Sequence, residues 1–120
     1  MADRRDPTGI PESADLRRLR RRIDALDRRL VALLNERATL ARETGRAKSA
    51  SGRRAIRDAE REREVLLRVS MANEGPLPQA DLLALYRRLF VATRALETRD
   101  RQRERERRHR HGDAQDGDDA

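Results

Sequence analysis

With 120 residues, the chain has room for one small domain and a single modest hydrophobic core. Charged residues make up 42% of the sequence and apolar residues 36%, with one Tyr, one Phe and no Trp, so the core must be aliphatic and thin. The absence of Cys excludes disulfides, thiolate metal sites and cysteine nucleophiles. So thin a core predicts an oligomer. No apolar run is long enough for a signal peptide or a membrane span, which predicts a cytoplasmic protein.

The formal net charge of +7 fits either a nucleic acid or a small anionic ligand. Arg is spread along the whole chain, often beside Asp or Glu, and of the 29 basic residues only Lys48 is a lysine. An ammonium is a compact point donor, whereas a guanidinium is a broad planar fork. Lys48 is therefore a candidate for a role that an arginine does not fill.

The N-terminal segment 1–14 contains two Pro, a Gly and several charges, and is predicted to be a flexible leader. A helix over residues 15–49 follows, with Ser13 or Asp15 as its cap. Its apolar residues recur at steps of three and four: Leu16, Leu19, Ile23, Leu26, Leu30 and Leu33. At about 1.5 Å per residue this helix is roughly 50 Å long. A helix of that length in so short a chain must lie against another chain.

Two further helices are predicted after a loop over residues 49–57. One runs over residues 58–73, and the sequence NEGPLP (73–78) separates it from the other, over 79–99. The domain ends near residue 101, and the charged, low-complexity tail 102–120 is expected to be disordered beyond a few solvated helical turns. The fold class is all-α, three helices with a very long first one.

Each helix carries polar residues on its apolar face. The stripe of the first helix through Leu30 and Leu34 continues into Arg37 and Lys48, with Arg20 on a neighbouring stripe. The other helices add polar residues at comparable positions: Asp58, Arg61, Glu62, Thr93 and Glu97. Taken singly, these residues could be helix caps, ion pairs or snorkelling arginines. Together, several inward cations need an anionic counterpart, either the chain's own carboxylates or a bound dianion, and the pattern alone fits both.

Three stretches resemble the all-helical chorismate mutases of the AroQ class. They are LRRRIDALDRRLVALLNERATLARETGRAK (19–48), IRDAERERE (56–64) and LYRRLFVATRALE (85–97). The resemblance covers residues 15–98 and implies an isomerase that converts chorismate to prephenate, a Claisen rearrangement in phenylalanine and tyrosine biosynthesis. Such a unimolecular reaction needs no cofactor and no metal. The enzyme selects the folded conformer and stabilises the charge that develops on the breaking ether oxygen.

The resemblance also implies a role for each polar residue. Arg37 matches the arginine that pairs with one substrate carboxylate, and Arg20 matches an arginine that reaches the second carboxylate from the partner protomer. Lys48 matches the lysine that donates to the ether oxygen. The remaining matches surround the ring hydroxyl or a carboxylate: Asp58 through its backbone, Glu62 through its side chain, Arg61 and Thr93.

Glu97 matches the position that closes over the ether oxygen, where many members of the family have Gln. A Gln donates a hydrogen bond at any pH, but a carboxyl group donates only when it is protonated. Glu97 therefore needs a raised pKa, or the enzyme should prefer acidic conditions. The sites predicted as catalytic are Lys48, Glu97 and Arg37.

The resemblance implies an intertwined homodimer, and it leaves open docking onto another enzyme of the shikimate pathway. Isochorismate pyruvate lyase and 4-amino-4-deoxychorismate mutase remain alternatives on the same scaffold, although Glu62 suits a ring hydroxyl. An Arg-rich adaptor or nucleic-acid binder is a more distant alternative. Against it, the tail alternates Arg with Glu, ends in GDAQDGDD and lacks aromatic residues. A bare coiled coil would not place Arg37 and Lys48 on its seam.

Overall fold

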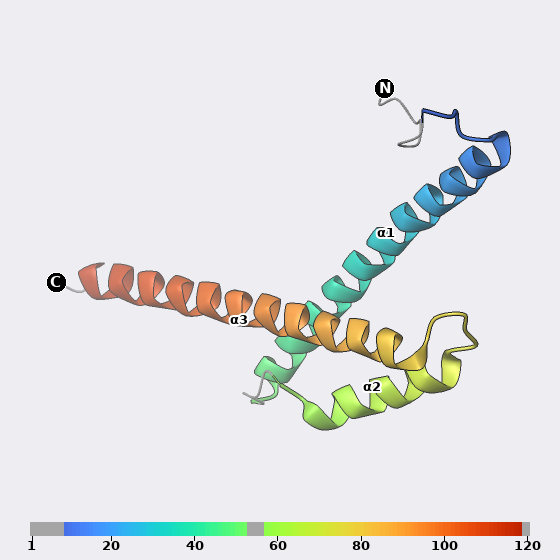
Figure 1. Cartoon of the computed structure of the whole chain (residues 1–120). Coiled ribbons are helices and arrows are strands. Elements are labelled where there is room, and N and C mark those ends of the chain that lie inside the picture. Colours follow the sequence, from blue (N-terminus) through green and yellow to red (C-terminus); the bar gives the residue numbers. More distant parts are fainter. Residues whose placement is uncertain (1–8, 53–56, 119–120) are drawn as a thin grey trace. The chain divides into compact units, whose positions relative to one another are not determined.

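The computed structural model describes residues 9–52 and 57–118, with side chains up to Gly112. It contains three helices, α1 (Ala14–Ala50), α2 (Ala59–Ala72) and α3 (Gln79–Asp118), and no β-strand in those two stretches (Figure 1). The predicted all-α class with a very long first helix is confirmed. The chain forms two compact units, Met1–Ala38 and Thr39–Ala120.

Parts of three predicted segments lie outside the described residues. These are residues 1–8 of the leader, residues 53–56 of the loop, which include the start of the second motif, and residues 119–120 of the tail. Within the described stretches, no helix is both long enough and apolar enough to cross a membrane.

In the N-terminal unit, α1 begins where a serine caps it. The Ser13 hydroxyl accepts a hydrogen bond from the backbone N–H of Leu16 at 3.1 Å, as expected for an N-cap. The preceding residue, Glu12, is buried and its carboxylate forms an ion pair with Arg20. Its carbonyl oxygen also accepts a hydrogen bond from the Arg17 side chain at 2.6 Å. Glu12 was expected in a flexible leader, but these two arginines hold it against the first turns of α1.

The apolar stripe of α1 is exposed in the N-terminal unit. Its six aliphatic side chains keep between 39% and 58% of their surface accessible: Leu16, Leu19, Ile23, Leu26, Leu30 and Leu33. Single exposed leucines are common, but a contiguous stripe of this length is typical of a protein–protein interface.

In the C-terminal unit, α1 ends in a turn that a glycine makes possible. The N–H groups of Ser51 and Gly52 donate to the carbonyls of Ala47 and Ser49, each at 3.1 Å. Gly52 has φ +84°, the left-handed conformation that often closes a helix. The predicted end of this helix, residue 49, is therefore correct to within one residue.

Helices α2 and α3 lie side by side and are joined by the predicted break at residues 73–78 (Figure 1). Asn73 organises this turn, because its side-chain oxygen accepts from the N–H of Gly75 at 3.0 Å and its amide donates to the carbonyl of Leu77 at 3.1 Å. Phe90 is the one buried hydrophobic side chain among the described residues, and the Tyr86 ring meets it edge to face at 6.4 Å. The core is as thin as the composition predicted.

The C-terminal part of α3 differs from the sequence-based expectation. Residues 102–120 were expected to be largely disordered, but α3 continues to Asp118. The charges that suggested disorder are spaced to support a helix, since Arg108 pairs with Glu104 at 2.8 Å and Arg110 pairs with Glu106 at 3.9 Å, both four residues apart. Amino-acid composition alone does not record this spacing.

Candidate functional site

In the C-terminal unit, α1 approaches α3 closely at Gly45 and Glu97. A Cβ atom added to Gly45 would lie 3.3 Å from Cγ and 3.4 Å from Cδ of Glu97. Both residues are buried, and Glu97 keeps only 8% of its surface accessible. The glycine therefore makes the room in which the Glu97 carboxyl group sits against α1. A glycine inside a helix is a sequence signal for such a contact, but its partner 52 positions away is not predictable from the pattern.

Burial favours the neutral form of Glu97. The pKa of its carboxyl group is raised, chiefly because burial penalises the charged form. The positive charges of Lys48 and Arg101 oppose this rise, and the negative charge of Asp100 adds to it. This is the direction that a hydrogen-bond donor at position 97 requires.

Lys48 lies in the last turn of α1, three residues after Gly45, and is half-buried. A cation in this position stabilises the C-terminal end of the helix dipole, which is a structural role available to any basic residue. The positive charge of Lys48 also acts on the Glu97 carboxyl group of α3 and opposes the rise of its pKa. An ammonium and a protonated carboxyl group are both hydrogen-bond donors, so the two groups together suit one developing negative charge.

Glu62 on α2 is fixed by an arginine that the sequence analysis did not single out. The Arg94 guanidinium of α3 donates to Oε2 of Glu62 at 2.5 Å, and the Arg57 Nε lies 3.8 Å from Oε1. The Glu62 side chain is only 18% exposed. Arg94 therefore holds this carboxylate in place across the α2–α3 contact. Arg94 directly follows Thr93, but nothing in its spacing distinguishes it from the other arginines of α3.

The other predicted residues of the C-terminal unit already have local partners. Asp58 is the N-cap of α2, with Oδ1 accepting from the N–H of Arg61 at 3.0 Å, so its side chain is used structurally. The Arg61 side chain is exposed and pairs with Glu64 at 3.3 Å. The Thr93 hydroxyl donates to the carbonyl of Leu89 at 2.9 Å, which leaves its oxygen able to accept a hydrogen bond. Lys48 and Glu97, by contrast, are two predicted residues that interact electrostatically.

Two predicted arginines belong to the N-terminal unit. Arg20 is exposed over about half of its side chain, which pairs with Glu12. Arg37 is half-buried on α1, one position before the end of this unit. Their relation to Lys48 and Glu97 stays a prediction.

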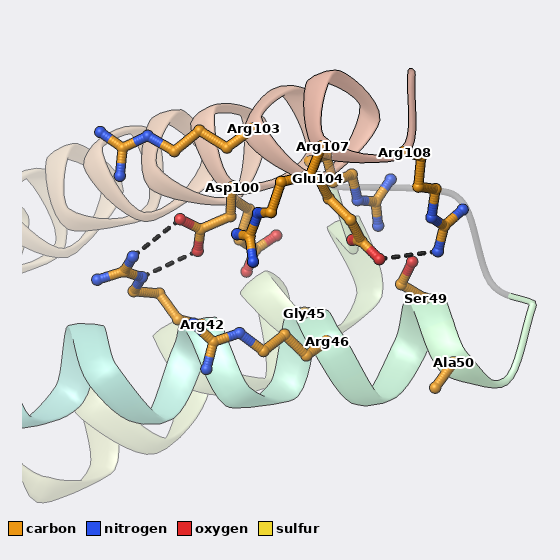
Figure 2. Close-up of a pocket in the computed structure, with 12 residues that line it drawn as sticks. Arg42, Gly45, Arg46, Ser49, Ala50, Asp100, Arg103, Glu104, Arg107 and Arg108 are labelled. Atoms are coloured by element: carbon orange, nitrogen blue, oxygen red, sulfur yellow. Dashed lines mark hydrogen bonds and ion pairs between the residues drawn. The ribbon is translucent and has the colours of Figure 1, made fainter. Parts of the chain in front are cut away.

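A second feature of the C-terminal unit adjoins Glu97. The Arg42 guanidinium on α1 donates two hydrogen bonds of 2.9 Å to the Asp100 carboxylate on α3, and this bidentate pair is visible in Figure 2. This pair lowers the pKa of the Asp100 carboxyl group, mainly through the hydrogen bond from Arg42. Next to it lies a hollow of about 540 Å³ between the end of α1 and the middle of α3, with Glu97 in its wall. Neither Arg42 nor Asp100 was a predicted site residue, because the pair joins positions 58 residues apart.

The described residues contain no cluster of three or more His, Asp or Glu side chains that could hold a metal ion.

Known proteins resemble this chain over most of its folded part. The bifunctional chorismate mutase/prephenate dehydratase of Stutzerimonas stutzeri is 39% identical over 92 residues, which are 73% of this chain and 25% of that protein. The protein of the same name from Aquifex aeolicus is 37% identical over 89 residues, 71% of this chain and 24% of that protein. The chain thus spans about a quarter of the length of these relatives.

A solved structure is also similar. Form II of the chorismate mutase from Thermus thermophilus has a TM-score of 0.67 and 33% sequence identity, and the match covers 71% of this chain and 96% of that one. The model of the family "chorismate mutase type II" matches residues 19–98, which include Lys48, Glu62 and Glu97. The chain belongs to the type II chorismate mutase family.

Proposed function

We propose that this protein is a chorismate mutase that converts chorismate to prephenate in the biosynthesis of phenylalanine and tyrosine. The observation that carries the proposal is the buried Glu97, which packs against Gly45 of α1, has a raised pKa and interacts electrostatically with Lys48, the only lysine of the chain. Membership of the type II chorismate mutase family supports the same substrate.

The reaction breaks an ether bond and forms a carbon–carbon bond within one molecule, and it gains from orientation and from charge stabilisation. Lys48 and protonated Glu97 donate to the ether oxygen as negative charge develops on it. Lys48 belongs to α1 and Glu97 to α3, so in this proposal the two donors approach the oxygen from different helices.

The remaining residues hold the substrate in its folded conformer. Arg37 and the partner's Arg20 bind its two carboxylates, Glu62 accepts from the ring hydroxyl, and Asp58 contributes through its backbone. Arg61 and Thr93 complete the site near a carboxylate. The ion pair with Arg94 fixes the rotamer of Glu62, so that a carboxylate oxygen is already oriented to accept from the ring hydroxyl.

The pH dependence follows from Glu97. Because only the protonated carboxyl group donates, kcat/KM should fall as the pH rises through the raised pKa of Glu97. Lys48 and Arg101 oppose the rise of that pKa, and a Gln at the same position would show no such decline, because it does not titrate.

A homodimer accounts for the exposed stripe on α1. Six aliphatic side chains that are 39–58% exposed would be covered if the first helices of two chains packed together, and the thin core would gain the apolar surface it lacks. In such a dimer each active site would take its second carboxylate-binding arginine, Arg20, from the other chain.

The test of the proposed function is a substrate panel. Purified protein is incubated separately with chorismate, isochorismate and 4-amino-4-deoxychorismate, and the products are separated and identified. The proposal expects prephenate from chorismate, with the other two substrates turned over at least tenfold more slowly. Preferential turnover of isochorismate or of the amino analogue would move the protein to another activity on this scaffold.

A further inference from the structure

The hollow beside Glu97 is lined by more arginines than acidic side chains. Six arginines contribute to its wall, against three acidic side chains, Glu97, Asp100 and Glu104. The arginines come from the end of α1 and from successive turns of α3: Arg42, Arg46, Arg101, Arg103, Arg107 and Arg108. Figure 2 shows side chains from both helices around this space. Its volume of about 540 Å³ is in the range of small-molecule sites.

Three of these arginines are available for a ligand. Arg42 is engaged by Asp100, and Arg108 pairs with Glu104 at 2.8 Å. Within the described part of the chain, Arg46, Arg103 and Arg107 form no direct hydrogen bond or ion pair, although the charges of Arg46 and Arg103 act on Asp100. Arg103 and Arg107 are four residues apart on α3, and Arg46 belongs to the part of the wall that α1 contributes. Like charges around one hollow repel one another, and a bound anion would offset that repulsion.

The hollow is separate from the side of α1 that carries Lys48. Lys48 does not line it, although Arg46 and Ser49 on either side of Lys48 in the sequence do. Residues two apart in a helix point roughly 160° away from each other, so Arg46 and Lys48 lie on opposite sides of the Gly45 contact. Glu97 lines the hollow and also interacts electrostatically with Lys48.

We propose that the hollow between the end of α1 and residues 100–108 of α3 is a binding site for a small multivalent oxyanion, held by Arg46, Arg103 and Arg107. The ligand class comprises compact molecules with several phosphate or carboxylate groups, because planar guanidinium forks bind both kinds of oxyanion through paired hydrogen bonds. The three arginines are exposed, so binding weakens as salt is added.

Occupation of this site changes the electrostatic surroundings of Glu97. The charged groups that act on Glu97 are Lys48 from α1 and Arg101 and Asp100 from α3. A bound anion opposes the two cations and reinforces the carboxylate, so the proton on Glu97 is held more tightly. In terms of the proposed function, on which this consequence rests, the decline of kcat/KM moves to higher pH.

Isothermal titration at low ionic strength tests the binding itself and requires no turnover. Inorganic pyrophosphate and citrate are the two probes, which separate phosphate from carboxylate ligands, and sodium chloride at equal ionic strength is the reference. The variant Arg103→Gln/Arg107→Gln removes two charges from the hollow. The matched variant Arg105→Gln/Arg110→Gln removes two charges from the same helix at positions that do not line it. Circular dichroism checks that both variants keep their helices.

The expected result is saturable binding of at least one probe to the wild-type protein, at one site per chain. Affinity falls at least tenfold in Arg103→Gln/Arg107→Gln and stays within about twofold in Arg105→Gln/Arg110→Gln. If the first variant fails to fold, Arg46→Gln on the opposite wall must produce the same selective loss.

Three results would overturn the proposal. No saturable binding of either probe leaves the arginines as a solvated surface. Equal weakening in both double variants shows attraction by diffuse charge. Loss of binding in Lys48→Ala places the anion at the active site instead. Binding that survives in a protein without mutase activity supports this site while refuting the proposed function, so the two failures are distinguishable.

Discussion

The close approach of Gly45 to Glu97 gives a prediction in which stability and activity separate. In Gly45→Ala, the added Cβ would lie 3.3 Å from Cγ and 3.4 Å from Cδ of Glu97. Carbon atoms pack best at roughly 3.5–4.0 Å, so the Glu97 side chain must move by a few tenths of an ångström. The distortion costs about 0.5–1.5 kcal/mol, while replacing Gly by Ala inside a helix returns about 1 kcal/mol. The melting temperature should therefore change little.

Activity should respond more strongly than stability. Misplacing a reacting group by about 1 Å can lower a rate roughly a hundredfold, so a shift of a few tenths predicts a loss of about three- to tenfold in kcat/KM. Gly45→Val, which places two more carbon atoms beside Glu97, should lose more. The assay follows the ultraviolet absorbance of chorismate, with melting curves recorded by circular dichroism on the same samples.

A second glycine in a helix provides the control. Gly112 of α3 has no atom within 4 Å of an added Cβ, so Gly112→Ala gains helix propensity without a steric conflict and should leave kcat/KM unchanged. Wild-type turnover in both Gly45→Ala and Gly45→Val would refute the reasoning, because it would mean that the position of Glu97 has no bearing on the chemistry.

Three other substitutions test the remaining parts of the account. Glu97→Gln should flatten the decline of kcat/KM at alkaline pH. Because a group with a raised pKa destabilises the fold as the pH rises, the variant should also have a higher melting temperature than wild type at pH 8 but not at pH 4. Activity and melting profiles that coincide with those of the wild type would contradict this. Inactive Arg20→Ala and Lys48→Ala chains, unfolded and refolded together in equal amounts, should recover about a quarter of wild-type activity through mixed dimers, whereas no recovery would argue against a shared site. Asp100→Asn should lower the melting temperature by a few degrees at pH 7, because the ion pair with Arg42 is lost. The difference from wild type should disappear once the pH falls below the lowered pKa of Asp100. Equal melting temperatures at pH 7 would mean that Asp100 is not paired.

Local sequence signals predicted the helices well. Apolar spacing, the Ser13 cap and the NEGPLP break are properties of neighbouring residues, and the observed helices begin at Ala14, Ala59 and Gln79, each within one residue of expectation. The end of α3 was mispredicted because composition was weighed more heavily than the four-residue spacing of Arg and Glu. That spacing was visible in the sequence.

The candidate site was predictable only where the residues follow a helical stripe. Lys48 and Glu97 stood out as polar side chains on apolar faces, and in the structure the two interact electrostatically. The partners that orient the site were not predictable, because Arg94 meets Glu62 across a separation of 32 residues in a chain with arginines at almost every turn. Such contacts depend on how helices pack, which no periodicity within one helix specifies.

The most direct test of the central claim is to measure prephenate formation from chorismate by wild-type protein and by Lys48→Ala under identical conditions. The wild type should convert chorismate rapidly, and kcat/KM in the variant should fall at least a hundredfold, since a donor to the developing oxyanion contributes roughly that factor. An absence of prephenate with folded wild-type protein, or equal rates for both proteins, would contradict the central claim.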